Sequence, residues 1–563
     1  MKYLLAAEAD RIQDLIFRSS RLREVVGGSQ LLTRFCDDVP ELLASRMNIE
    51  ANVITRGGGS FRVEFENEDG DKAKGDALRF GAALAEAYNR ATGGTLSVAK
   101  PVKIADDSEP AWKKASEDVG ENLRQAKRQG PPVATPHIPY IAFCESCGVG
   151  LAEAHEGRVE GEEEGKHYIC PSCRAKSAEQ VTKSMGKFLK PFYRKIVSGE
   201  ALSSMEWPHD ADAVGKYDAR GYVAYIVADG DGMGKIFHDC NRDQAQKLSK
   251  EMSEVLRQAL AESLKRFMPA PAATLNPWFM PVLPLILGGD DLFALVPACW
   301  ALDMAQHLCK TFQREMTEFA HRQGIQHEIT MTAAVVFCKA NYPYYLAHQI
   351  GERRLSEAKR VVKALAADDG PHLSAVDFEI VLGSQVEPKE LTGKRRSTLR
   401  PYWVTGKKED SEEPEEDKKE REKIEKVLRQ EGWGLPIRVL LEQRLALVDT
   451  PSRRLSQLRD LFNRVSVSTP GDADARQRWN DDWDDEMKRL LKRIERDWTQ
   501  KRKHPVRAAL DTLGGVEIKK WYKVERKSDD ERWQGHGLPD LLRVWEWTLD
   551  LDHDPVEYEG GGR

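Results

Sequence analysis

The sequence predicts an α+β protein with two ferredoxin-like units, an insert between them and a helical domain after the second. The order strand, helix, hairpin, helix, strand occurs once from residue 1 and again from Gly221. Two CxxC pairs lie between the copies, and apolar residues after Trp433 recur at helical spacing. The predicted boundaries are 1–130 for the first unit, 131–220 for a linking region that contains the insert (144–173), 221–400 for the second unit, 401–430 for a charged linker and 431–563 for the helical domain.

The first unit opens on an apolar strand over residues 1–9 and continues as a helix from Arg11 to Met47. The pair Gly27-Gly28 followed by Ser29 predicts a break inside that helix. A hairpin follows, and its turn reads Arg56-Gly57-Gly58-Gly59-Ser60. The other predicted elements are strands over 51–55 and 61–65, a helix over 71–91 and a strand over 95–104.

The second unit repeats this order with acids in its turns. Its first strand, GYVAYIVAD, ends at Asp229, and its hairpin turn reads Gly288-Gly289-Asp290-Asp291. The other predicted elements are helices over 242–267, 300–322 and 344–366, and strands over 282–287, 292–297 and 327–338. The stretch 406–426 is almost entirely charged, which is typical of a solvated linker.

Composition narrows the class of protein. The 563 residues are 40% hydrophobic and 31% charged, which is a globular balance with room for several domains. A net charge of −6 argues against coating nucleic acid by bulk charge. No stretch approaches the roughly 18 apolar residues that span a bilayer, so no membrane partner is expected. The nine unevenly spaced cysteines indicate a reducing, cytoplasmic location rather than a disulfide framework.

The insert carries the spacing of a zinc ribbon. Four cysteines form two CxxC pairs separated by 22 residues, and they are Cys144, Cys147, Cys170 and Cys173. Four thiolates make a closed tetrahedral site, so the predicted zinc is structural. A redox CxxC is disfavoured because the pair occurs twice without a thioredoxin-like unit around it. His155 or His167, which lie inside the insert, remain alternative ligands.

The acids of the second unit predict a divalent-metal site. In a ferredoxin-like sheet the first strand lies beside the hairpin strands, so Asp229 and Asp231 should converge on Asp290 and Asp291. Carboxylates gathered in this way repel one another, and a divalent cation removes that cost. Two Mg²⁺ or Mn²⁺ ions bound here could activate a ribose hydroxyl and neutralise a leaving pyrophosphate. Alone, the turn could be an ordinary Gly-Asp hairpin.

Glycines and a lysine complete the predicted nucleotide site. Gly288 and Gly289 let the backbone approach a nucleotide without an intervening Cβ. Gly230, together with the glycines up to Lys235, forms a loop whose N–H groups could meet phosphate. Lys359, in the last helix of the unit, could reach a triphosphate, with Lys363 one turn away as the substitute.

These stretches together resemble the large, polymerase-like subunit of type III CRISPR effector complexes and, more distantly, the GGDEF diguanylate cyclases. In the second unit the matching stretches are DGDGMGKIF, ILGGDDLFALVP and RLSEAKRVVK. In the first they are RIQDLIFRSSRLREVVGGSQLL and ITRGGGSFRVEF, and the CxxC pairs lie between. The resemblance covers residues 1 to about 385, and it implies that both units are palm domains of the polymerase and cyclase type.

The resemblance implies an activity, partners and residue roles. The second palm would make cyclic oligoadenylates from ATP after the complex has bound foreign RNA. Asp229, Asp290 and Asp291 would be catalytic metal ligands, and Lys359 would bind the triphosphate. Asp231 matches the second acid of the strand-end motif and has a less defined role. The implied partners are ATP, other effector-complex subunits, and guide and target RNA held through the complex.

Two departures from the family pattern change the expectations. The first palm has Gly57-Gly58-Gly59-Ser60 where an active hairpin carries acids, so it should bind or support without catalysing. The histidine-aspartate nuclease domain with which many members begin is not expected here. His209-Asp210 and His238-Asp239 are interpreted as chance dipeptides, so DNA cleavage is not expected.

Two other functions stay open at this point. One is a free-standing nucleotide cyclase with another product, because nothing in the sequence determines base choice. The other is a non-catalytic scaffold that only holds nucleotides or subunits. The intact acids of the second hairpin count against a scaffold, since a scaffold has no need to keep them together.

Overall fold

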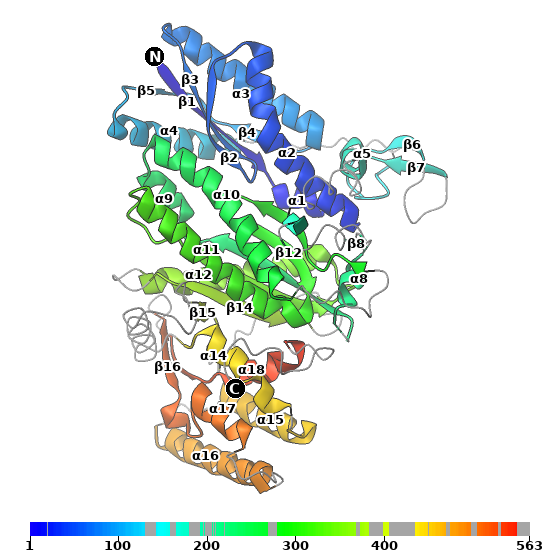
Figure 1. The fold of residues 1–563 in the computed structure, drawn as a ribbon, viewed down its shortest axis with the longest axis vertical. Coiled ribbons are helices and arrows are strands. Elements are labelled where there is room, and N and C mark those ends of the chain that lie inside the picture. The colour runs from blue at the N-terminus through cyan, green and yellow to red at the C-terminus, as the bar shows by residue number, and fades with distance from the viewer. Residues whose placement is uncertain are drawn as a thin grey trace.

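Figure 1 presents the fold as a computed structural model. The structure describes residues 1–19, 21–129, 142–157, 165–178, 192–194, 196, 205–206, 208, 210–218, 220–267, 278–366, 372–381, 398–404, 434–448, 450–468, 473–496, 504–526 and 531–548. None of the helices in these ranges is long and apolar enough to cross a membrane.

The first unit is a sheet in the strand order β2-β3-β1-β4, with β5 also paired to β1. All of its pairings are antiparallel. Two long helices, α2 and α3, pack against each other. The elements are β1 (Lys2–Asp10), α1 (Ile12–Phe17), α2 (Leu22–Met47), β2 (Ala51–Gly57), β3 (Ser60–Glu66), α3 (Gly70–Thr92), β4 (Thr95–Val98), β5 (Val102–Ile104) and α4 (Glu109–Arg128).

The second unit has the sheet order β11-β12-β9-β13-β14-β15. Its first four strands repeat the 2-3-1-4 order of the first unit, so the predicted pair of ferredoxin-like units is confirmed. The pair β13–β14 is parallel and extends the sheet beyond the repeat. The elements are β9 (Tyr222–Gly230), α9 (Met233–Asp239), α10 (Arg242–Lys265), β11 (Leu283–Gly288), β12 (Asp291–Pro297), α11 (Ala301–Arg322), β13 (Met331–Lys339), α12 (Tyr344–Ala366), β14 (Ser374–Ile380) and β15 (Tyr402–Val404).

Local sequence signals set several helix ends. Asn241 and Gln244 form a reciprocal capping box at the start of α10. The Asp69 side chain accepts from the backbone N–H groups of Asp71 and Lys72 at the start of α3. At the other end of α3, Gly93 adopts a left-handed conformation with φ 70°, which glycine allows without strain.

Two predictions about elements are wrong, and two strands were missed. Gly27 and Gly28 do not break a helix; α2 runs through them, and the break falls earlier, between α1 and α2. The predicted strand over 95–104 is two strands, β4 and β5. The strands β14 and β15 were not expected, because they belong to an extension of the sheet and not to the repeated unit. Residues 405–433, which include most of the predicted charged linker, lie outside the described residues.

The insert and the C-terminal part complete the chain. The described insert elements are β6 (Glu153–Gly157), β7 (Gly165–Ile169) and α5 (Pro171–Ala178), followed by β8 (Met205–Glu206) and α8 (Ala211–Gly215), and β8 pairs with β10 (Trp278–Phe279). After the second unit come α14 (Ile437–Glu442), α15 (Ser452–Ser468), α16 (Ala473–Arg496), α17 (Pro505–Leu513), the hairpin β16 (Tyr522–Arg526) and β17 (Glu531–Gly535), and α18 (Leu538–Val544). These C-terminal helices share one apolar core with the second unit, and Figure 1 shows them on the side away from the first unit.

The two ferredoxin-like units face each other hairpin to hairpin. Helix α10 packs on β2, and α2 packs on β11. Arg242 of α10 donates two hydrogen bonds of 2.9 Å to the buried Glu64 carboxylate of β3. A Cβ placed on Gly57 would lie 3.8 Å from the backbone nitrogen of Gly289. The glycine-rich turns of the two hairpins therefore meet, which leaves a cleft between the units.

Candidate functional site

The hairpin of the second unit places its acids opposite the end of β9. Strand pairing sets Gly288 against Asp291 across the β11–β12 turn. Ala228 of β9 pairs with Leu292 of β12 in the antiparallel register. The residue after Ala228, Asp229, therefore lies opposite the residue before Leu292, Asp291, at the same edge of the sheet. The turn needs a left-handed residue, and Gly289 supplies it with φ 65°.

The carboxylates at this edge influence one another. Burial and the Asp229 charge both raise the pKa of Asp290 and hold that of Asp291 well above its usual range. Such shifts mean that the ionised cluster is unfavourable without a compensating cation. Asp291 nevertheless opens to solvent, so a cation and its ligand can reach it. Of the predicted acids, Asp229, Asp290 and Asp291 form this open group.

Asp231 lies deeper and has different partners. The hydroxyls of Thr330 (2.9 Å) and Thr332 (2.8 Å) donate to its carboxylate. Burial is the main cause that raises its pKa to about 6, although nearby Lys359 opposes the shift. Its backbone N–H donates to the Thr330 carbonyl oxygen at 2.9 Å, so that N–H is not free for a phosphate. These contacts suit a role for Asp231 in holding the end of β9 in place better than a role as a ligand for a metal ion bound in the cleft.

Lys359 of α12, which the sequence predicts as a triphosphate ligand, lies beside the acids in this structure. Its Nζ forms an ion pair with Asp229 and donates to the Gly230 carbonyl oxygen at 2.8 Å. The same Nζ is 3.9 Å from Asp231 Oδ1. Lys363, the substitute candidate, is exposed one turn further along the helix. Of the two lysines, the structure therefore brings Lys359 to the acids.

Glu352 is a further acid at the site that the sequence reasoning missed. It lines the same cleft as Asp229 and Asp291. Burial and the charge of Asp229 raise its pKa. Glu352 precedes Lys359 by seven residues, so the two share a face of α12, and this two-turn spacing is the signal that could have found it.

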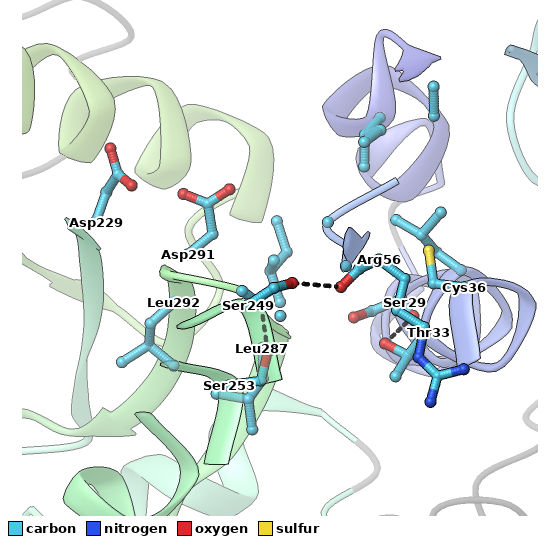
Figure 2. A pocket seen from close by; sticks show the side chains of 18 of the residues that line it. Ser29, Thr33, Cys36, Arg56, Asp229, Ser249, Ser253, Leu287, Asp291 and Leu292 are labelled. Carbon is cyan, nitrogen blue, oxygen red and sulfur yellow. Dashed lines mark hydrogen bonds between the residues drawn. The ribbon is translucent and has the colours of Figure 1, made fainter. Parts of the chain in front are cut away.

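The cleft between the units has a volume of about 1290 Å³. Figure 2 shows Asp229 and Asp291 on one wall, and Arg56, Ser29, Thr33 and Cys36 on the other. Ser249 of α10 donates to the Arg56 carbonyl oxygen at 3.4 Å, and Ser253 accepts from the Gly289 N–H at 3.2 Å. Gly288 and Gly289 both line the cleft. The basic residues lining it are Arg11, Arg56, Lys127, Lys247, Lys250 and Arg257.

The matching edge of the first unit keeps only part of the acidic set. Glu8 of β1 pairs with Ser60 of the hairpin, and the Ser97 hydroxyl donates to Asp10 at 2.8 Å. Gly59 and Ser60 replace the two hairpin acids. Lys127 of α4 forms an ion pair of 2.5 Å with Glu8. A lysine therefore neutralises Glu8, which lines the cleft at this edge.

The four cysteines of the insert converge. Their sulfur atoms all lie within 4.8 Å of one another, and Cys144, Cys170 and Cys173 are buried. Backbone N–H groups of Gly150 and Cys173 donate to Cys147 Sγ and Cys170 Sγ at 3.4 Å. A closed set of four sulfurs with N–H···S bonds suits a structural zinc ion. The side chains of His155 and His167 lie outside the described residues.

Of the two histidine-aspartate dipeptides, the structure describes His238-Asp239, which belongs to a surface cluster of histidines and acids. His238 Nε2 lies 2.5 Å from Glu117 of α4, and its Nδ1 lies 3.0 Å from Asp239. His327 Nε2 lies 2.8 Å from the other oxygen of Asp239. This exposed cluster bridges the two units through α4 and α9. His209 is outside the described residues.

The sheet order, the acidic hairpin and the lysine on the last helix define a palm domain of the polymerase and cyclase class. Residues 222–365 match the family model described as "Cas10/Cmr2, second palm domain". The second unit is thus similar to the second palm domain of Cas10/Cmr2 proteins over the matched residues. No curated protein matches the sequence significantly.

Solved structures of Csm1–Csm4 assemblies resemble the chain at low identity. The Csm1–Csm4 cassette in complex with cA4 is 15% identical, with a TM-score of 0.42 over 69% of this chain and 55% of that one. The Csm1–Csm4 subcomplex of the type III-A CRISPR–Csm interference complex is also 15% identical, with a TM-score of 0.42 over 70% and 56%. The cassette with one ATP gives the same values as the subcomplex. The chain spans little more than half the length of these proteins.

Proposed function

We propose that the second palm is a metal-dependent nucleotidyl cyclase that makes cyclic oligoadenylates from ATP. One observation carries the proposal: Asp229 and Asp291 meet at one sheet edge and line a cleft large enough for nucleotides, and Asp290 lies beside them in the hairpin turn. A domain of the Cas10/Cmr2 second-palm type provides the setting. A scaffold would gain nothing from this cluster, because its mutual repulsion has to be compensated.

The residues present fit two divalent cations. Magnesium prefers a few carboxylates and leaves further positions for phosphate oxygens and water. Asp229, Asp290 and Asp291 would hold the ions, and the bound ions would supply Lewis-acid activation of a ribose hydroxyl and charge neutralisation of the leaving pyrophosphate. Lys359 would turn from Asp229 to the triphosphate, and the Gly288-Gly289 turn would let phosphate approach the backbone. Asp231 would keep the end of β9 in place through Thr330 and Thr332.

We further propose that the chain works inside a type III effector complex, with other subunits, guide RNA and target RNA as partners. The mildly acidic chain does not suit strong independent RNA binding, so RNA would act through the assembly. The isolated chain should then turn over slowly, and matched RNA bound to the complex should accelerate it.

Product analysis with magnesium and each of the four nucleoside triphosphates tests the proposal. Cyclic oligoadenylates from ATP alone, made by the complex with matched RNA, support it. A cyclic product from another base, made equally fast by the isolated chain, would indicate a free-standing cyclase. Absence of turnover in every state, with nucleotide still bound, would indicate a scaffold.

A further inference from the structure

The short helix α1 forms part of the wall of the cleft. Ile12, Gln13, Asp14 and Ile16 of this helix line it. Phe17 at its end meets Phe293 of β12 edge-on at 5.3 Å, two residues from Asp291. Ile12 lies under the hairpin of the first unit, where a Cβ on Gly59 would come 2.7 Å from its Cδ1. Helix α1 therefore touches both hairpins that border the cleft.

Little within α1 itself explains its stability. It has six residues, and isolated helices of this length do not form in water. Arg11 precedes it in a left-handed conformation with φ 50°, which is unusual for a residue other than glycine, and provides no side-chain cap. The last carbonyl groups of any helix also need partners from outside it.

The cysteine insert supplies such a partner. Lys176 lies in α5, three residues after Cys173, and its Nζ donates to the Leu15 carbonyl oxygen of α1. The Lys176 residue is only 1% exposed. A buried ammonium group is costly unless it is bonded, and a cation at the C-terminal end of a helix also complements the helix dipole. Lys176 thus acts as a C-terminal cap that reaches α1 from another element.

Glycines in α2 allow this approach. A Cβ on Gly27 would overlap the Lys176 carbonyl oxygen, and one on Gly28 would lie 3.4 Å from Lys176 Cε. Beside them, the buried Glu24 accepts from the Ser146 hydroxyl and, at 3.3 Å, from the Ser177 hydroxyl. Ser146 and Ser177 both belong to the insert. The insert therefore packs against the first unit at the Gly27-Gly28 pair.

We infer that the cysteine insert is a clamp on the nucleotide cleft, and that Lys176 is a positioning residue that holds α1 in the wall of that cleft. The effect on nucleotide affinity rests on the proposed function, whereas the effect on α1 does not. Losing a charge-assisted hydrogen bond changes an equilibrium constant by about tenfold or more.

The experiment compares the full chain with Lys176→Met and Gly27→Ala, each loaded with zinc. Gly75→Ala is the matched glycine control, because a Cβ on Gly75 of α3 meets nothing within 4 Å. The readouts are zinc content, amide hydrogen exchange of residues 12–17, and the dissociation constant for ATP with magnesium. We expect both test variants to keep zinc, to exchange at α1 about tenfold faster and to bind ATP about tenfold more weakly. Gly75→Ala should behave as the wild type does.

Two results would overturn the inference. Unchanged exchange at α1 in zinc-loaded Lys176→Met would show that the insert does not hold this helix. Faster exchange at α1 with unchanged ATP affinity would show that α1 does not shape the site. If the wild-type chain binds no ATP at all, the proposed function fails instead, and the exchange measurement still decides whether the clamp exists.

Discussion

Glu8 of the first unit occupies the register position of Asp229 in the second. Glu8 pairs with Ser97 of β4, as Asp229 pairs with Thr332 of β13. Two residues further along, Asp10 accepts from Ser97 and Asp231 accepts from Thr332. The two units therefore share a strand-end framework of acids. They differ in the hairpin, where Gly59 and Ser60 stand in place of Asp290 and Asp291.

This difference predicts an asymmetric response to mutation. Asp290→Ala combined with Asp291→Ala should abolish nucleotide turnover, because the remaining acids cannot hold two cations. Ser60→Ala in the first unit should leave turnover within about twofold, since no hairpin acid is lost there. Turnover is measured as product formed from ATP with magnesium. Unchanged product formation by the double variant would mean that the chemistry takes place elsewhere.

The stability of the magnesium-free protein should fall as pH rises from about 4 to about 7. In the folded state the pKa of Asp231 is raised to about 6, and the pKa of Asp290 is raised as well. The folded state therefore binds more protons than the unfolded state in this pH window. Folding is then favoured at the acidic end and opposed as these groups ionise. Asp290→Asn with Asp291→Asn should flatten the dependence and stabilise the protein at pH 8 by about 1–3 kcal/mol. Urea unfolding across the pH range, with and without magnesium, provides the check, and a parallel slope for wild type and variant would contradict it.

Lys359 and Lys363 should differ sharply although they are one helical turn apart. Lys359→Ala removes the cation beside Asp229 and should weaken ATP binding by about tenfold or more, which is typical of a lost charge-assisted contact. The exposed Lys363→Ala serves as the matched control and should change affinity by less than about twofold. Calorimetric titration with ATP and magnesium measures both. Equal effects would remove Lys359 from the nucleotide site.

The purified chain should hold one zinc ion per molecule in the cysteine insert. Cys170→Ser should lose that ion and unfold the insert, because structural zinc sites contribute folding energy directly. Cys309→Ala, which changes a buried cysteine of α11, should keep it. Elemental analysis of the two variants measures the zinc that each retains. Zinc retained by Cys170→Ser would point to His155 or His167 as a ligand.

The C-terminal helices should depend on a buried ionic network with the second unit. Asp540 of α18 is fully buried, 3.3 Å from Arg400 Nε, and accepts from the Tyr402 hydroxyl at 2.7 Å. Asp540→Ala leaves Arg400 buried without this partner and should cost about 3–5 kcal/mol of unfolding free energy. Glu442→Ala, which removes an exposed ion pair with Arg438, should cost less than about 0.5 kcal/mol. Chemical denaturation of both variants tests this, and similar midpoints would contradict it.

The sequence alone determined the features that depend on local pattern. The alternation of apolar strands and helices predicted both ferredoxin-like units, because each unit buries its faces within a short stretch of chain. The two CxxC pairs predicted the four-sulfur cluster, because ligand spacing within each knuckle is local. The proximity of the strand-end acids and the hairpin acids could be predicted from the sequence, because the sheet order of this fold places those strands side by side.

Only the tertiary structure decided what happens between distant segments. Glu352 joins the acids because α12 lies across β9, and the partners of Asp231 come from the far side of that strand. Gly27 and Gly28 read as a helix break in the sequence, but they lie inside α2, where the insert packs on them. A glycine pair signals either a turn or a close approach, and the neighbour that distinguishes the two, Lys176, is about 150 residues away in the chain. Propensity and spacing act over a few residues, whereas close packing against a distant element is settled only when the whole chain has folded.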